Sequence, residues 1–161
     1  MIAARLIKHL NSRAVMRLVR WRGLLVAPMT LGVRGIVLNA ERRVFLVRHS
    51  YVGGWHFPGG GVEPGETVRE ALTRELGEEG NIVVEGELRL HGFYFNDRYS
   101  RRDHIAVFVI RDFRQTAPRA PDWEIIGAEF FPLESLPVDT TTAVRQTLAE
   151  LIDGTPIREN W

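Results

Sequence analysis

Three glutamates, Glu75, Glu78 and Glu79, crowd into a segment that otherwise predicts a regular helix. At about 100° per residue, Glu75 and Glu79 continue the inward apolar stripe that begins at Val68, instead of lying opposite it. Glu78 lies within about 100° of arc of both, so three carboxylates converge near the helix end. Their repulsion would raise their pKa values and destabilise the fold unless a cation lies among them.

Clustered carboxylate oxygens with room for water are typical of a Mg²⁺ or Mn²⁺ site that shares its metal with substrate phosphates. The turn Pro58-Gly59-Gly60-Gly61 lies just before the helix, and glycine lets the backbone approach a ligand closely. Arg74 can pair with a neighbouring glutamate and fix its rotamer. The alternative, an ordinary helix with an Arg74–Glu78 ion pair, is disfavoured by the inward stripe. The pattern predicts a polyphosphate site between the glycine turn and the helix end.

The helix that positions these acids has clear ends. Thr67 followed by Glu70 forms a capping box, which predicts a helix start at Thr67. The helix is expected to run to about Gly80, with Asn81 as a left-handed stop.

Strands are predicted on both sides of this helix. Residues 31–39 and 43–49 flank a three-residue turn and predict a β-hairpin. Residues 87–95 and 104–113 predict two more strands, the second apolar enough to be buried on both faces. A short strand is expected around 124–131.

The last predicted element is a helix from about Asp139 to Asp153, ended by Gly154. Strands before and after one central helix, closed by a terminal helix, predict a single mixed α/β layered domain over residues 31–161. The inward residues of the last helix are expected to be Val144, Leu148, Leu151 and Ile152.

Residues 1–30 differ in charge from the rest: positions 1–40 carry seven Lys or Arg and no acid. Apolar residues at helical spacing predict a basic amphipathic helix over 3–20, followed by a connector. We expect this helix to pack on the domain or at a homodimer interface. Docking on an anionic membrane or a nucleic acid is the less favoured alternative, and no nucleic-acid partner is expected.

Composition limits the classes of protein. The 161 residues fit one domain, and the absence of cysteine excludes disulfides, thiolate metal sites and cysteine nucleophiles. No apolar run approaches the roughly 20 residues of a membrane span, and no signal-peptide core is evident, so a cytoplasmic location is expected. The Arg-rich start also resembles an organelle transit segment.

The stretch from Gly60 to Ile82 resembles the Nudix box, G-x5-E-x7-R-E-U-x-E-E-x-G-U, in which U is aliphatic. One position differs, because Asn81 stands where the family has glycine. Asparagine is the next best residue for a left-handed helix end, so the geometry is expected to survive. The matching residues are Gly60, Glu66, Arg74, Glu75, Leu76, Glu78, Glu79 and Ile82.

The resemblance implies an α/β/α sandwich with a mixed sheet. It also implies hydrolysis, with Mg²⁺ or Mn²⁺ and water, of a nucleoside diphosphate linked to a moiety X. In-line attack at phosphorus would give a nucleoside monophosphate and phospho-X. The whole substrate would be a nucleotide sugar, a dinucleoside polyphosphate or a nucleoside triphosphate. A domain of the same fold that only binds a nucleotide or a partner is the alternative, whereas an isoprenoid diphosphate isomerase would require a cysteine.

The resemblance also assigns roles to residues. Arg74 would orient Glu75, and Glu66 would support that end of the helix. Glu75 or an acid from a later loop would take the proton of the attacking water. Glu124 is the first candidate for that acid and Glu129 the second. The implied metal ligands are the Gly59 carbonyl, Glu75, Glu78, Glu79 and Glu124.

Substrate recognition is expected from the glycine turn and from residues 93–104, which combine aromatic side chains with arginines for stacking and phosphate binding. A solvated hairpin loop is the alternative. Tyr99 lies near a tyrosine of family members that cleave dinucleoside polyphosphates, and Arg101 and Arg102 follow it. His49, His56 and His104 are expected to be hydrogen-bonded strand or turn residues, and Trp55 a packing anchor for the glycine turn.

Overall fold

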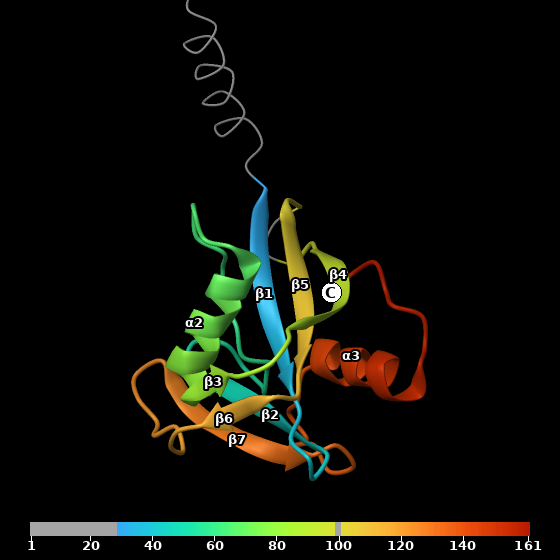
Figure 1. The fold of residues 1–161 in the computed structure, drawn as a ribbon. Coiled ribbons are helices and arrows are strands. Elements are labelled where there is room, and N and C mark those ends of the chain that lie inside the picture. The colour runs from blue at the N-terminus through green and yellow to red at the C-terminus, as the bar shows by residue number, and fades with distance from the viewer. Residues whose placement is uncertain (1–28, 99–100) are drawn as a thin grey trace, which may run out of the picture.

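The computed structural model describes residues 29–98 and 101–161 of the chain (Figure 1). The predicted helix over 3–20 therefore lies outside the described residues, and so does Tyr99. Within the described ranges, no helix is long and apolar enough to cross a membrane. The strands are β1 (Thr30–Val37), β2 (Arg43–His49), β3 (Ile82–Val84), β4 (Arg89–Asn96), β5 (Asp103–Ile110), β6 (Phe113–Gln115) and β7 (Ile125–Pro132), and the helices are α2 (Val68–Gly80) and α3 (Thr142–Asp153).

The strands form three small sheets. In the first, of order β1-β5-β4, β1 runs parallel to β5 and β4 antiparallel to it, so this sheet is mixed. The second pairs β2 with β7 antiparallel, and the third pairs β3 with β6. The parallel pair aligns Thr30 with Asp103 and therefore joins segments that are far apart in the sequence.

The predicted hairpin between residues 31–39 and 43–49 is wrong. The chain does reverse there, since Asn39 N–H donates to Arg43 O at 3.1 Å and Arg42 adopts a left-handed φ of 58°. Beyond a single bridge between Leu38 and Val44, however, the two strands enter different sheets. All eight residues of β1 are paired with β5, which leaves β2 to pair with β7.

Two hydrophobic cores lie on opposite faces of the strands. In β1, Val33 and Val37 belong to the core under α2, whereas Ile36 belongs to the core under α3. Residues of β2 and β5 alternate between the two cores in the same way. Figure 1 shows α2 on one side of β1 and β5 and α3 on the other, which is the predicted α/β/α sandwich. Strand β5 is buried from Ile105 to Ile110, as its apolar run predicts.

Helix α2 begins and ends as its sequence predicts. Thr67 is the N-cap, and both hydrogen bonds of its capping box with Glu70 are present. Asn81 ends the helix in the left-handed conformation, with φ 53° and ψ 34°, and its N–H reaches Gly77 O and Leu76 O. Asn81 thus adopts the left-handed conformation predicted for it.

Helix α3 begins at Thr142, three residues later than its predicted start at Asp139. The intervening residues form a turn, in which Thr140 N–H donates to Pro137 O at 3.0 Å. Val144 and Leu148 face the core as predicted, but Ile152 is 45% exposed and the prediction that it lies inward is wrong.

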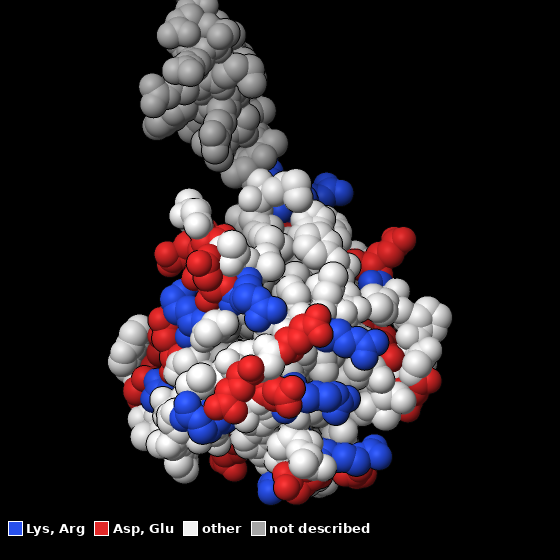
Figure 2. Space-filling view, in the orientation of Figure 1, with Lys and Arg blue, Asp and Glu red and all other residues white. Residues whose placement is uncertain are grey.

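The face that carries α2, β3 and β6 shows acidic and basic side chains interleaved (Figure 2). One such pair joins Arg114 Nε to Glu85 Oε1 at 3.0 Å, with both side chains more than half exposed. Exposed pairs of this kind contribute about 0–1 kcal/mol each. Burial in the two cores therefore provides most of the stability that holds the site together.

Candidate active site

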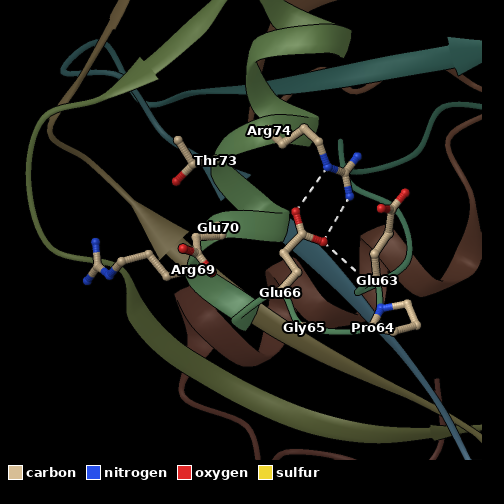
Figure 3. Close-up of a pocket in the computed structure, with 8 residues that line it drawn as sticks. All are labelled: Glu63, Pro64, Gly65, Glu66, Arg69, Glu70, Thr73 and Arg74. Carbon is tan, nitrogen blue, oxygen red and sulfur yellow. Dashed lines mark hydrogen bonds and ion pairs between the residues drawn. The ribbon is translucent and has the colours of Figure 1, made fainter.

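Arg74 lies at the centre of an ion-pair network on α2. Its Nε donates to Glu66 Oε1 at 3.0 Å and its Nη2 donates to Glu66 Oε2 at 3.2 Å (Figure 3). Its Nη1 donates to Glu75 Oε1 at 2.8 Å and lies 3.5 Å from Glu78 Oε2. Hydrogen bonds to Glu66 and then to Glu75 raise the pKa of Arg74 above its ordinary value. The guanidinium therefore remains charged and fixes both carboxylates.

Glu66 ties the start of α2 to the preceding loop. Its Oε2 also accepts from Glu63 N–H at 3.0 Å, so one carboxylate joins the loop to Arg74 (Figure 3). The Arg74 hydrogen bond, followed by the Glu63 N–H, lowers the pKa of Glu66. Glu66 thus connects the loop to the helix, while its supporting role in catalysis stays a prediction.

Glu75 packs on the glycine turn. A side-chain carbon at Gly60 would collide with both carboxylate oxygens of Glu75, and Gly60 O accepts from Arg34 Nη1 at 3.3 Å. At Gly59, φ is +137° and an added carbon would collide with Val33 O. The turn therefore requires glycine at both positions, one for its backbone conformation and one for the approach of the carboxylate.

Glu79 is the buried acid of the three, with 7% of its surface exposed. Its Oε2 accepts from Gly59 N–H at 2.7 Å, and its Oε1 lies 3.6 Å from His49 Nε2. Burial, with further contributions from Glu75 and Glu124, raises the pKa of Glu79 to about 7, although the Gly59 N–H and Arg34 oppose the rise. Glu79 is therefore a buried carboxylate whose negative charge is not fully compensated by the positive groups around it.

Glu78 differs from its two neighbours, because its side chain is 61% exposed. Among the described residues, no three His, Asp or Glu side chains already stand close enough together to hold an ion. Arg74 holds Glu75, and Gly59 holds Glu79. The three glutamates of α2 are therefore brought to one helix end, but Glu75 and Glu79 are directed to protein partners and Glu78 is mostly exposed.

The donor set nevertheless fits a hard divalent cation. It consists of carboxylates beside a glycine backbone, and one of them, Glu79, is buried with a raised pKa next to Glu75. A cation there would remove the unfavourable charge that burial imposes on Glu79. The residues that would hold it are Glu75, Glu78, Glu79 and the Gly59 backbone.

Arg34, on β1, brings a positive charge to the same place. Its Nη1 donates to Val33 O at 2.7 Å and to Gly60 O at 3.3 Å. Burial lowers its pKa, while Glu79 and Glu75 oppose that fall. Arginine keeps its proton even so, and its remaining donors are suited to phosphate oxygens.

A cavity of about 510 Å³ opens beside the glycine turn, large enough for a nucleotide. It is bordered by strands β1, β4 and β5, by the start of α3 and by the last residue of the sequence. Gly59 and Gly60, which line the cavity with Arg34, also contact Glu79 and Glu75, so this part of the cavity lies next to the acids. The other residues that its lining includes are His49, Tyr51, His56, Phe57, Asn96, Arg98, Ile105, Val144 and Trp161.

Glu124 is the later acid that lies near the glutamates. Its carboxylate contributes to the raised pKa of Glu79 and, after burial, to that of Tyr51. Ser50 N–H donates to Glu124 O at 2.9 Å, which holds its loop beside the end of β2. Glu129, the second candidate, lies exposed on β7 opposite Leu46.

The arginines predicted to bind substrate are divided by the structure. Arg98 lines the cavity, whereas Arg101 and Arg102 are exposed in the turn before β5 and do not line it. A role for those two in binding therefore stays a prediction, as does a role for Tyr99, which lies outside the described residues.

The histidines and Trp55 follow their predictions in part. His56 Nε2 lies 3.0 Å from Gly53 O, a satisfied turn histidine. His49 and His104 lie on strands as predicted, but within the described residues the Nδ1 atom of each finds no hydrogen-bond partner, so a satisfied hydrogen bond stays a prediction for both. Trp55 is a packing residue, although it packs on Phe131 of β7, with ring centroids 4.7 Å apart.

Arg34 and Trp161 are site residues that the sequence analysis missed. Arg34 carried one signal, a charge in the middle of an apolar strand. Trp161 carried none, because the sequence does not show that the segment after α3 returns to the sheet.

Comparisons with known proteins give a consistent result. The model of the NUDIX domain family matches residues 28–152. The ADP-ribose pyrophosphatase of Methanocaldococcus jannaschii is 32% identical over 104 residues, which cover 63% of this chain and 61% of that protein. An RNA pyrophosphohydrolase of Legionella pneumophila is 42% identical over 68 residues, 39% of each chain. The match thus spans less than two thirds of the length of either relative.

The fold is also found in solved structures. The MutT NUDIX hydrolase from Burkholderia pseudomallei superimposes with a TM-score of 0.66 at 24% identity, covering 77% of this chain and 98% of that one. At this level of identity the likeness shows the fold alone.

Proposed function

The chain belongs to the NUDIX family, and from this premise we propose that it hydrolyses a pyrophosphate bond in a nucleoside diphosphate linked to a moiety X. The products would be a nucleoside monophosphate and phospho-X. The cofactor would be Mg²⁺ or Mn²⁺, and the substrate a small nucleotide derivative. Residues 31–161 would form the hydrolase domain.

One observation carries this proposal: the buried carboxylate of Glu79, whose pKa is raised to about 7, lies with Glu75 against the Gly59–Gly60 turn that lines the cavity. Burying this acid next to another one does not stabilise the fold, so a purely structural role does not explain it. Perturbed acids beside a cavity are instead typical of a site that handles charge.

The residues around the cavity suit each requirement of the reaction. Arg34 and the glycine turn would bind the phosphate oxygens, and Arg74 would keep Glu75 in one rotamer. When bound, the divalent ion would neutralise phosphate charge and lower the pKa of the attacking water. Glu75 or Glu124 would accept the water proton as the new phosphorus–oxygen bond forms and the bridging bond breaks.

The names of the relatives suggest candidates for X. One relative is an ADP-ribose pyrophosphatase and another an RNA pyrophosphohydrolase. The first name points to nucleotide sugars, and the family resemblance adds dinucleoside polyphosphates and nucleoside triphosphates, so we propose to test these three classes of compound first.

The test measures release of nucleoside monophosphate from such a panel with Mg²⁺ or Mn²⁺ by ion-exchange chromatography. Glu79→Gln should reduce kcat/KM by about 100-fold or more, because the amide cannot compensate a cation as a carboxylate does. Glu85→Gln, which changes an exposed acid that pairs with Arg114 and does not line the cavity, is the matched control. If no compound is hydrolysed, or if Glu79→Gln is as fast as wild type, the proposal is wrong. If no compound is hydrolysed, a protein that binds nucleotides without cleaving them is favoured instead.

A further inference from the structure

The segment that follows α3, residues 155–161, returns to β4 and joins its edge (Figure 1). Phe95 N–H donates to Glu159 O at 2.7 Å, and Trp161 N–H donates to Phe95 O at 2.9 Å. A parallel bridge pairs Phe95 with Asn160. This return segment therefore continues the mixed sheet beyond β4.

A buried carboxylate on α3 fixes the return segment. Glu150, which is 5% exposed, accepts the backbone N–H of Arg158 at 2.9 Å through Oε1 and the Tyr94 hydroxyl at 2.7 Å through Oε2. Arg158 Nη1 lies 2.8 Å from the same Oε1, and Nη2 donates to Thr147 Oγ1 at 3.2 Å. Charge-assisted contacts of this kind, held away from water, keep a segment in one place.

The anchored segment places Trp161 in the wall of the cavity. Its indole packs on Tyr94, with ring centroids 5.3 Å apart, and more loosely on Phe57, at 6.5 Å. The side chain is only partly buried by these contacts, and it lines the cavity that also contains Gly59 and Gly60. An aromatic surface is thus held rigidly at the site.

We propose that Trp161 is a specificity-determining residue and that it selects substrates carrying a heterocyclic base. The inference rests on the proposed function, since it places the nucleotide in the same cavity. Stacking on an aromatic side chain increases the affinity for a base by about 5- to 150-fold. His56 and Asn96 share the lining, and Asn96 Oδ1 finds no hydrogen-bond partner among the described residues. Arg34 and the glycine turn, which also line the cavity, suit the diphosphate.

Binding to compounds that cannot be hydrolysed tests this proposal. The probes are the α,β-methylene analogues of ADP, GDP, CDP and UDP, together with methylenediphosphonate, which has the same phosphorus core without a nucleoside. Affinities are measured by calorimetry with Mg²⁺. Trp161→Ala should lower the affinity for the best-bound nucleoside probe about tenfold and leave the affinity for methylenediphosphonate unchanged. Trp123→Ala, which removes an 82% exposed indole outside the lining, is the matched control and should bind as wild type does.

Two further variants separate stacking from folding. Trp161→Phe should retain most of the affinity but lose the tryptophan fluorescence change that the nucleoside probe causes in wild type. Arg158→Ala should weaken the nucleoside probe because it releases the return segment, whereas Arg114→Ala, which breaks an exposed ion pair, should not.

The inference is overturned if Trp161→Ala binds every nucleoside probe as wild type does. It is also overturned if the affinity of this variant for methylenediphosphonate falls by the same factor as its affinity for the nucleoside probe. If Trp161→Ala does not fold, an unchanged fluorescence response in Trp161→Phe overturns it instead. Binding that depends on Trp161 without turnover of any substrate would contradict only the proposed hydrolysis. Turnover that does not depend on Trp161 would contradict only this inference.

Discussion

Arg74 holds two carboxylates with the two edges of one planar group. Glu66 receives Nε and Nη2, and Glu75 receives Nη1. A lysine could not reproduce this arrangement, because an ammonium is a point charge without fixed donor directions. The rotamer of Glu75 in this protein therefore depends on a guanidinium at position 74.

We predict that Arg74→Ala lowers kcat/KM roughly 10- to 100-fold, in the range found when a partner that orients a metal ligand is removed. Arg74→Lys should fall between this variant and wild type. Arg69, which Figure 3 shows extending away from Arg74 on the same helix, offers the control Arg69→Ala. Equal losses in Arg69→Ala and Arg74→Ala would contradict an orienting role.

His49 and Glu79 form a buried pair whose titrations oppose each other. Burial, with smaller effects of His56 and Arg34, lowers the pKa of His49 to about 4, and burial raises the pKa of Glu79 to about 7. Although their atoms lie 3.6 Å apart, these directions make both groups neutral near pH 5.5, so we do not treat them as an ion pair.

The two shifts have opposite effects on stability. Between pH 4.5, its ordinary pKa, and about pH 7, Glu79 holds a proton in the folded state but not in the unfolded state. The free energy of unfolding therefore falls as pH rises through that window. Between about pH 4 and pH 6.5, its ordinary pKa, His49 holds a proton in the unfolded state but not in the folded state. The free energy of unfolding therefore falls as pH falls through that window. In wild type the two slopes nearly cancel.

We therefore predict opposite slopes in the single variants, measured by urea unfolding with a chelator present. Glu79→Gln should gain stability as pH rises from about 4 to 6.5, and His49→Gln should lose stability from about 4.5 to 7. Each change should be about 3 kcal/mol, because each window is about 2.5 pH units wide. Slopes of the same sign in both variants would contradict the assigned pKa directions.

At the scale of elements, the glycine turn and α2 make one unit, because Glu75 packs directly on Gly60. We predict that Gly60→Ala reduces kcat/KM by tenfold or more, as the methyl group displaces the Glu75 carboxylate. Gly61→Ala is a neighbouring control, since a carbon added there meets nothing within 4 Å. A comparable loss of activity in Gly61→Ala would show that activity depends on any substitution in the turn, and not on the contact with Glu75.

Helix α2 could be predicted closely because local rules decide its ends. The capping box of Thr67 and the left-handed Asn81 act within one turn of the helix. The hairpin from 31–39 to 43–49 failed for the opposite reason. An apolar strand pattern shows that a strand is buried, but not which strand will pair with it, and β1 pairs with a strand far along the chain.

At the scale of the whole molecule, the sandwich brings together residues from distant parts of the sequence. Arg34 of β1, Glu79 of α2 and Glu124 before β7 meet near the cavity only because the two cores fix the strands between α2 and α3. The acids on α2 could be predicted, since they share one helix. Trp161 could not, because its place depends on Glu150 and the edge of β4.

The same assembly should make the stability of the whole protein depend on divalent ions. A cation that binds only the folded site stabilises it by about 2.7 kcal/mol at a hundredfold excess over its Kd. We predict that Mg²⁺ or Mn²⁺ raises the Tm of chelator-treated protein by about 5–10 °C. Glu79→Gln should show less than half of this rise, because it removes the buried carboxylate. Glu85→Gln, whose exposed acid pairs with Arg114, should keep all of it. Equal rises in the two variants would mean that the ions bind elsewhere, and the helix end would then need another explanation for its three glutamates.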